Sequence, residues 1–295
     1  MAHPQIAVFA RVAKGGEAPR RVVFGQATLL SRTMHDIRYN EVRDEMYVTN
    51  PFGQAILTFR GTAKGDEAPI RIIQGPKTML GGEDTLEVDA VNGEILIPAG
   101  NEMLIFPVAA NGDVAPIRRP RAARGAGWRI GNGIAVDNVH NVIATDGGLS
   151  GDFAKKYPMD NKYGGGRDTI LIFDRLADGE VMPQRVIRGD KTGIFGIRQM
   201  QVYPKGGWII VSQITDGGIP EPEGTFVGVW SIYDNGNIAP RWRIDGKPSN
   251  LMKKPRGVTL NPKYKELIVS DMRLNAVLTF SFPELFNEVA RPPRN

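Results

Sequence analysis

Residues 56–73 read ILTFRGTAKGDEAPIRII, and residues 104–119 read LIFPVAANGDVAPIRR. Each stretch holds an apolar run containing phenylalanine, a turn with glycine and aspartate, an Ala-Pro pair and a second run with arginine. Short apolar runs bounded by turn residues are typical of β-strands. The shared pattern therefore predicts two antiparallel strands joined by a turn.

The same pattern occurs five times along the chain. The prolines that mark it are Pro19, Pro69, Pro116, Pro183 and Pro240. Successive prolines lie 50, 47, 67 and 57 residues apart, and an arginine stands two residues after each of the first four. Self-similarity at this period indicates propeller blades or solenoid turns.

Two further strand-like runs in hairpin spacing complete each repeat, as in residues 133–137 (GIAVD) and 141–145 (NVIAT). We label the hairpin strands A and B, the phenylalanine-containing strand C and the strand after the proline D. A four-stranded blade cannot bury both of its faces until neighbours stack on it, so such units in series predict an all-β propeller. One short helix is expected near residues 283–289.

Five blades are expected, because the chain offers five A strands and five D strands. It begins with C and D strands, near residues 6–10 and 20–24, and ends with A, B and C strands. Pairing of the N-terminal D strand with this last set would close the ring. The sixth C strand leaves a six-bladed ring as the alternative. We predict one β-propeller domain over residues 1–295, with repeats near 6–55, 56–103, 104–169, 170–228 and 229–282.

Composition and charge limit the classes of protein. With 41% hydrophobic and 23% charged residues, the 295-residue chain is typical of a globular protein, and no apolar run is long enough to span a membrane. The absence of cysteine excludes thiol nucleophiles, disulfides and iron–sulfur clusters. The net charge is +5, with arginines dense over residues 118–124, but interleaved acidic residues favour a mixed surface over a specific nucleic-acid site.

The N-terminus has no signal-peptide pattern. A cytoplasmic protein and a secreted or periplasmic one whose signal has been removed both stay open, and so does the oligomeric state.

Residues 133–146 (GIAVDNVHNVIATD) and 93–119 (GEILIPAGNEMLIFPVAANGDVAPIRR) resemble the repeats of NHL-type six-bladed propellers. Less closely, they resemble the gluconolactonase and strictosidine-synthase superfamily of propellers. The resemblance covers nearly the whole chain and implies the fold. The resemblance gives little information about function, because propellers include lactonases, lyases, scaffolds and ligand receptors.

The functional face is predicted from two long connections between B and C strands, residues 146–168 and 213–228. Long loops on a rigid scaffold commonly carry binding residues. In a propeller, the D-to-A connections lie on the same face. The starts of the A strands and the ends of the B strands would therefore surround the mouth of the central channel there.

The polar residues at those starts and ends differ from blade to blade, whereas the proline turns repeat. This variation favours a ligand over a water-filled structural channel, which is the alternative. The candidate binding residues are His35, Asp36, Asn50, Asp84, Asn132, Asp146, Arg198, Gln199, Gln213, Arg256 and Asp271.

Two chemistries suit these residues. The resemblance to lactonase propellers implies a single divalent cation such as Ca²⁺, and Asp84, Asn132, Asp146 and Asp271 offer oxygen ligands for it, although no cofactor is required. Arg198 and Arg256 could instead bind an anion by charge-assisted hydrogen bonds. The basic residues of the first long connection could assist, namely Lys155, Lys156, Lys162 and Arg167. His35 beside Asp36 is either a general base or a structural residue.

The leading hypothesis is a propeller that binds a small molecule or a protein at the channel mouth. The first alternative is a metal-dependent lactonase-like hydrolase, and the second is a scaffold in a larger assembly. Whether the protein is an enzyme stays open, because the chain contains no Gly-x-Ser-x-Gly, P-loop or His-Glu-x-x-His motif.

Overall fold

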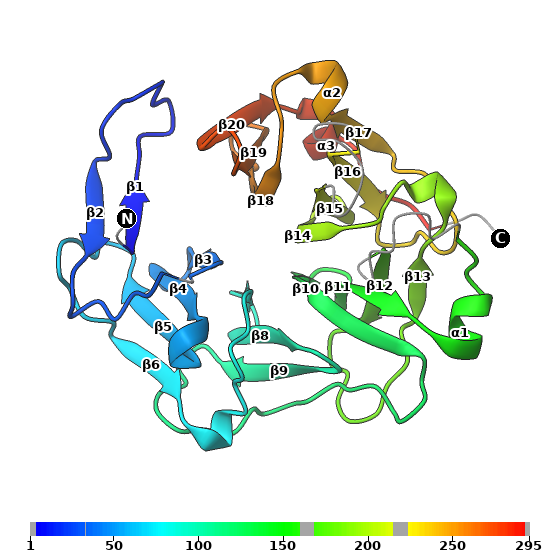
Figure 1. Cartoon of the computed structure of the whole chain (residues 1–295), viewed down its shortest axis with the longest axis horizontal. Coiled ribbons are helices and arrows are strands. Elements are labelled where there is room, and N and C mark those ends of the chain that lie inside the picture. The colour runs from blue at the N-terminus through cyan, green and yellow to red at the C-terminus, as the bar shows by residue number, and fades with distance from the viewer. Residues whose placement is uncertain (1–3, 33, 160–167, 215–223, 293–295) are drawn as a thin grey trace. The chain divides into compact units, whose positions relative to one another are not determined.

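The computed structural model describes residues 4–32, 34–159, 168–214 and 224–292. The fold is all-β and consists of five mainly four-stranded antiparallel blades of a β-propeller, which confirms the predicted fold class and blade number (Figure 1). The chain divides into two units. Unit 1 comprises Met1–Ile97 and Leu104–Ile117, unit 2 comprises Pro98–Met103 and Arg118–Asn295, and each is described by itself.

Unit 1 begins with a two-stranded sheet and continues with one complete blade and most of a second. The first sheet pairs β1 (Gln5–Val8) with β2 (Arg21–Phe24). The complete blade contains β3 (Ile37–Asn40), β4 (Glu45–Asn50), β5 (Ala55–Arg60) and β6 (Arg71–Gln74), with the short 3₁₀ helices η1 (Pro51–Gly53) and η2 (Pro76–Thr78). The next sheet contains β7 (Glu87–Asp89), β8 (Glu94–Ala99) and β9 (Glu102–Pro107), and the boundary between the units crosses β8 and β9.

Unit 2 contains the remaining three blades. The third blade has β10 (Trp128–Asp137), β11 (Val142–Leu149), β12 (Thr169–Asp174) and β13 (Arg185–Ile187). The fourth has β14 (Ile197–Tyr203), β15 (Trp208–Gln213), β16 (Phe226–Ser231) and β17 (Trp242–Asp245). The fifth has β18 (Pro255–Asn261), β19 (Glu266–Asp271) and β20 (Ala276–Ser281).

Helices are few and short. Helix α3 (Pro283–Asn287) confirms the helix expected near the C-terminus. The sequence did not predict α1 (Gly151–Lys155), η3 (Asp190–Thr192) or α2 (Gly246–Ser249). Within the parts of the chain that the structure describes, no helix is long and apolar enough to cross a membrane.

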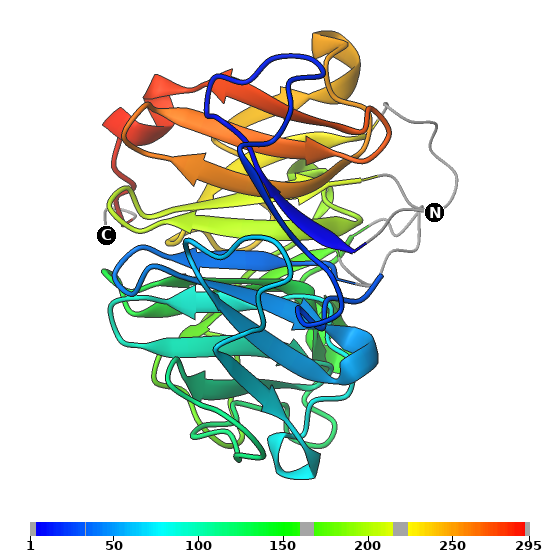
Figure 2. The same ribbon diagram turned by 90° about the vertical axis from the view of Figure 1, so that its left-hand side faces the viewer.

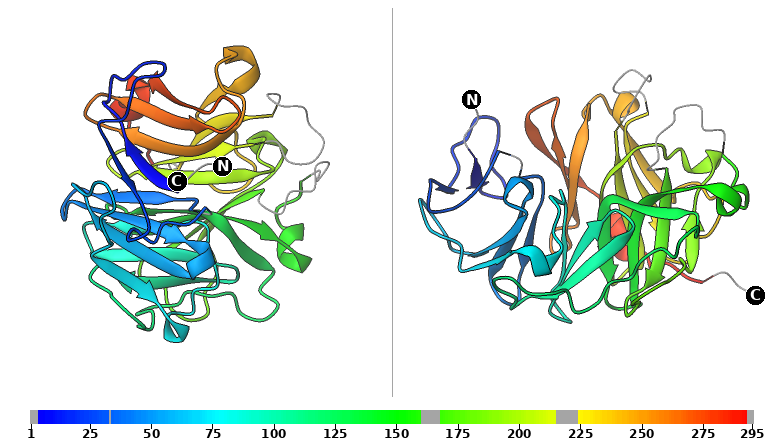
Figure 3. Two further views of the ribbon diagram at one scale, coloured as in Figure 1. Left: turned by 60° about the vertical axis from the view of Figure 1, so that its left-hand side comes forward. Right: turned by 60° about the horizontal axis from the view of Figure 1, so that its bottom comes forward.

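Stacking of the blades explains why the middle strands are buried along their whole length. In unit 2, the sheet β14–β17 packs between the sheets β10–β13 and β18–β20 (Figures 2 and 3). Trp230 of β16 and Ile209 of β15 are buried against the third blade, whereas Val229 and Ile210 are buried against the fifth. Both faces of these strands are therefore core, and every residue of β15 and β16 is buried.

The second blade lacks a regular fourth strand, although a D strand was predicted after Pro116. Pro120 has no N–H to donate to a ladder, so pairing here is reduced to single bridges. Its carbonyl accepts the amide of Met103 at 2.9 Å. Arg121 then forms isolated bridges with Glu102 and Glu180.

The proline turns tie consecutive blades together. In unit 1, Ile73 of β6 bridges Gly112 in the next turn, and the Lys77 amide donates to Asp113 Oδ1 at 2.7 Å. Gly75 has φ 132°, and a Cβ there would lie 2.5 Å from the Asp113 carboxyl carbon, so the contact requires glycine. We call this contact the inter-blade latch. It recurs at Gly25 with Asp66 and at Gly189 with Asn237.

The closure of the ring stays a prediction. The fifth blade has three strands, and β1 pairs antiparallel with β2 from Gln5 opposite Phe24. Pairing of the N-terminal D strand with the last blade would join the two units, which are described separately.

Candidate functional site

The A strands of unit 2 carry a repeated irregularity on the side of the predicted site. Strands β10, β14 and β18 are neighbours in the order β10, β14, β18 (Figure 1). The register of each against its B strand shifts near its start: between Ile130 and Ile134 in β10, between Ile197 and Gln199 in β14, and between Pro255 and Gly257 in β18. Such β-bulges leave a residue unpaired in the ladder and redirect its side chain.

Three of the predicted binding residues are the bulged ones. Asn132, Arg198 and Arg256 lie inside the three register shifts, and each is half-buried. We call these three residues the bulge row. The bulges therefore bring residues that are far apart in sequence to equivalent positions on neighbouring strands of one unit.

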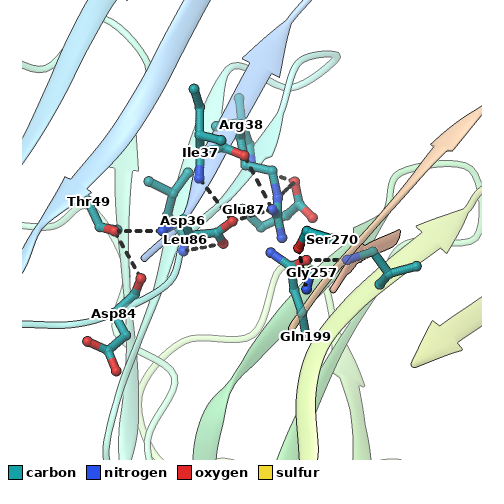
Figure 4. A network of polar contacts seen from close by, with 12 residues as sticks. Asp36, Ile37, Arg38, Thr49, Asp84, Leu86, Glu87, Gln199, Gly257 and Ser270 are labelled. Carbon is teal, nitrogen blue, oxygen red and sulfur yellow. Dashed lines mark hydrogen bonds and ion pairs between the residues drawn. The ribbon is translucent and has the colours of Figure 1, made fainter. Parts of the chain in front are cut away.

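Each bulge is held by a polar side chain of the paired B strand, which accepts the amide of the residue that follows the bulge. The donor–acceptor pairs are Gly133 N with Asp146 Oδ1 at 2.5 Å and Gln199 N with Ser212 Oγ at 3.2 Å. In the third bulge, Gly257 N donates to Ser270 Oγ at 2.9 Å (Figure 4). A Cβ at Gly131 would clash with the Asp146 carboxylate, which explains the first glycine of the Gly-Asn-Gly run in this bulge. Predicted site residue Asp146 is thus a buried support of the row.

Gln199, another predicted site residue, is buried and links two blades of unit 2. Its Oε1 accepts the amide of Val258 at 2.6 Å, so the side chain connects β14 to β18 (Figure 4). This bond joins the strand segments that carry two members of the bulge row, because Arg198 directly precedes Gln199 and Arg256 lies two residues before Val258.

Gln213 and Asp271, at the ends of two B strands, bind the backbone. Gln213 Nε2 donates to the carbonyls of Gly193 and Gly224, both at 2.9 Å, and its Oε1 accepts the Phe195 amide at 2.8 Å. The Asp271 carboxylate accepts four backbone amides, those of Lys253, Lys254, Arg273 and Leu274, at 2.6, 2.8, 3.0 and 3.0 Å. Both side chains therefore tie the strand end to the loops that flank it.

In unit 1, two predicted residues form an accessible polar pair. His35 Nδ1 lies 2.9 Å from Asp84 Oδ1, and the side chains are 34% and 32% exposed. Asn50 instead supports the backbone, because its Nδ2 donates to the Leu29 carbonyl at 2.9 Å and its Oδ1 caps η1. A cavity next to Asn50 has a volume of only about 10 Å³, which is room for a single water molecule.

Asp36 belongs to a buried ion-pair network that sequence reasoning missed. Arg38 Nη1 donates to Asp36 Oδ1 at 2.6 Å, and Arg38 Nε lies 3.4 Å from Glu87 Oε1 (Figure 4). Burial raises the pKa of both Asp36 and Glu87, although Arg38 opposes the rise. The signal in the sequence was a charged residue two positions after Asp36, which puts both side chains on one face of the strand.

The metal prediction stays untested as a set, because Asp84 lies in unit 1 and Asn132, Asp146 and Asp271 lie in unit 2. Among the residues that the structure describes, no group of three His, Cys, Asp or Glu side chains is arranged to hold a metal ion. Within unit 2, Asp146 and Asp271 already accept backbone amides.

The two long connections are described in part. Residues 160–167, with the predicted anion-binding residues Lys162 and Arg167, lie outside the described residues, and so do residues 215–223. At the start of the first connection, Lys155 pairs with Asp152 at 2.7 Å and Lys156 lies 5.9 Å from the centre of the Phe153 ring. At its end, Arg188 forms a buried pair with Asp168 at 3.1 Å.

Unit 2 also contains a cavity of about 420 Å³ at the start of the first long connection. Residues 122–129 form one wall, and Gly148, Leu149, Ser150 and Asn101 complete it. The sequence did not predict it, because strand A of this blade was expected to start near Gly133, whereas β10 starts at Trp128.

Comparison with known proteins identifies the fold alone. No family model and no curated protein matches the chain. Hydrazine synthase from Kuenenia stuttgartiensis is similar with 12% identity and a TM-score of 0.52, over 80% of this chain and 55% of that one. A chain of the mitotic checkpoint complex is similar with 14% identity and a TM-score of 0.53, over 89% of this chain and 66% of that one. The chain therefore spans 55% and 66% of the lengths of these two proteins' chains. No comparison assigns the chain to a family, the NHL-type propellers included.

Proposed function

We propose that the protein is a binding platform, and that unit 2 holds a ligand or partner through an anionic group at the bulge row. The observation that carries this proposal is the recurrence of the bulge on three neighbouring strands, with two arginines and one asparagine at the bulged positions. Bulges concentrate next to binding sites because they redirect single side chains without disturbing the sheet.

The chemistry of the row supports an anion as the recognised group. The planar guanidinium groups of Arg198 and Arg256 suit the two oxygens of a carboxylate or phosphate, and the Asn132 amide can donate or accept a hydrogen bond. All three residues are half-buried, where hydrogen bonds to a charged group are stronger than in bulk water. The sequence prediction of an anion bound by Arg198 and Arg256, on the face that carries the long connections, leads to the same proposal.

The metal-dependent hydrolase alternative is not carried forward. A cation held by Asp146 and Asp271 would have to compete with the backbone amides that these carboxylates accept. Those amides would then be left without acceptors inside the protein, which costs free energy.

Ligand-observed saturation-transfer NMR tests the proposal. The probes are acetate, citrate and inorganic phosphate, the last followed by phosphorus NMR line width, with glycerol as the neutral comparison. We expect the anions to bind the unaltered protein and the double variant Arg198→Ala/Arg256→Ala to lose that binding. The matched control is Arg291→Ala, which removes an exposed arginine of the same unit. Equal binding of the anions by the double variant would overturn the proposal.

A further inference from the structure

Within the part of the chain that the structure describes, one loop recurs four times between a D strand and the next A strand. In each copy, the hydroxyl of a threonine or serine donates to a glycine carbonyl three residues earlier and accepts the amide two residues later. In the second copy, Thr78 Oγ1 donates to the Gly75 carbonyl at 2.6 Å and accepts the Leu80 amide at 3.3 Å. The other copies are residues 25–30, 189–194 and 246–251.

The residue after this threonine or serine has a left-handed backbone in all four copies. Its φ is 57° at Leu29, 63° at Met79, 66° at Gly193 and 50° at Asn250. Glycine and asparagine adopt this conformation most readily, whereas the Cβ of a bulky residue is crowded there. Unit 2 therefore has the residues that the loop favours, and unit 1 has two that strain it.

Packing in the core does not explain the leucine and the methionine. The Leu29 side chain is 50% exposed and that of Met79 is 42% exposed. Strained residues concentrate at functional sites, where the surrounding structure holds them in place. The strain and the exposure together point to a contact of these side chains with something outside the chain.

A third apolar side chain is held next to both loops. Phe52 of η1 is 77% exposed. Asn50, which caps η1, donates to the Leu29 carbonyl at 2.9 Å. On the other side, Gln74 directly precedes the loop 75–80, and its Nε2 donates to the Gly53 carbonyl of η1 at 2.6 Å. We call the three exposed side chains the apolar rim, namely Leu29, Phe52 and Met79.

The apolar rim is small for a stable protein interface. Three side chains of this size and exposure present on the order of 300 Å² to solvent, whereas each partner of a stable complex buries about 800 Å². A lipid bilayer requires no complementary folded surface, because apolar side chains enter the boundary between its head groups and acyl chains. The area therefore favours a lipid surface over a folded protein.

The charges beside the rim are compatible with anionic lipids. Lys77, in the loop 75–80, is exposed. The nearby carboxylates are engaged within the protein: Glu83 accepts two backbone amides of its own loop, and Asp84 pairs with His35. The net charge of the whole protein is +5, and the negative potential of an anionic membrane attracts basic groups.

We propose that the apolar rim docks unit 1 on a membrane surface that contains anionic lipids. The three apolar side chains enter the boundary below the head groups, and Lys77 faces the lipid phosphates. The docking is reversible, because a few inserted side chains bind a membrane only weakly. The rim lies in unit 1 and the bulge row in unit 2, so this inference does not rest on the proposed function.

Vesicle co-sedimentation of the full chain tests the proposal. The probes are vesicles of phosphatidylcholine alone and vesicles of phosphatidylcholine with phosphatidylglycerol. We expect the anionic vesicles to bind the protein more strongly than the neutral ones. Phe52→Ser should weaken this binding about tenfold, because it removes the most exposed side chain of the rim. The matched control is Val42→Ser, which removes an exposed valine near the other end of β4 and should leave binding unchanged.

The double variant Leu29→Asn/Met79→Asn separates a binding role from a folding role. Asparagine suits the left-handed backbone, as at Asn250, so Tm should stay the same or rise while vesicle binding falls about tenfold or more. Absence of binding to the anionic vesicles would overturn the inference, and so would unchanged binding by Phe52→Ser and the double variant. Absence of vesicle binding together with self-association that the double variant loses in sedimentation velocity would assign the rim to a second copy of the chain instead.

Discussion

Replacement of Asp271 by alanine separates a structural role from a binding role at the end of a B strand. The side chain is 2% exposed, and its two oxygens accept four backbone amides. Two of the amides belong to the segment that leads into β18, and the other two belong to the turn between β19 and β20. Asp271→Ala therefore leaves four donors without their acceptor in a buried place.

The expected loss follows from these contacts. A hydrogen bond to a charged group contributes about 1.5–3 kcal/mol, but such terms are not additive, and water can enter the space that the carboxylate leaves. We expect the free energy of unfolding to fall by about 3–5 kcal/mol, which is the usual cost of breaking a buried charged network. An unfolding entropy of about 2.1 cal/mol/K per residue converts this loss into a fall of about 5–8 °C in Tm for a 295-residue chain.

Urea unfolding followed by circular dichroism measures this loss, with calorimetry for Tm. Asp271→Asn should be intermediate, because its remaining carbonyl oxygen can still accept two amides. The control is Asp152→Ala, which removes an exposed carboxylate whose pair with Lys155 contributes little. If Asp271→Ala unfolded like the unaltered protein and instead lost anion binding, Asp271 would be a ligand-binding residue and the structural interpretation would be wrong.

Three further outcomes are expected. Gly75→Ala should lower the free energy of unfolding by about 2 kcal/mol or more, because the φ of 132° and the contact with Asp113 exclude a Cβ. The control Gly16→Ala, where a Cβ would meet open space, should not lower it. Equal stabilities of the two variants in urea would contradict the role given to the inter-blade latch. Burial opposes ionisation of Glu45, but Arg71 and two other donors lower its pKa below 4.5, so it stabilises the fold above pH 4.5 and this contribution is lost on acidification. The stability gap between the unaltered protein and Glu45→Gln should therefore shrink below pH 4.5, and a gap that widens in urea titrations would contradict this. Dialysis against EDTA should leave Tm unchanged, and a chelator-dependent fall would revive the lactonase-like alternative.

Much of the fold could be predicted because propeller blades are local in sequence. The alternation of apolar runs and proline turns predicts hairpins directly. The stacking of the blades then follows from the repeat alone, because each blade contacts its neighbours in the sequence. The missing strand of the second blade could not be seen in the pattern alone, since it depends on Pro120 lying where a ladder would need a donor. The early start of β10 depends on Gly147, because only a residue without a Cβ fits against the Arg129 carbonyl. This requirement is visible only when the position of the paired strand is known.

The candidate site was harder to predict, because variation between blades has two causes. Arg198 and Arg256 lie on β-bulges, which redirect their side chains, so these two residues vary because of their position in the sheet. Gln213 and Asp271 differ because each must match the backbone groups of loops with different lengths. Residue type at one position therefore cannot separate recognition from loop support. The dense arginines over residues 118–124 were visible in the sequence, but not the wall that residues 122–129 form with residues 148–150.

A crystal structure of the protein grown with citrate tests the bulge row most directly. We expect a carboxylate of citrate within hydrogen-bond distance of Arg198 or Arg256 in unit 2, and no such density in crystals of the Arg198→Ala/Arg256→Ala variant. Citrate bound only elsewhere, or bound identically in both proteins, would contradict the proposal that the bulges of β10, β14 and β18 create the binding site.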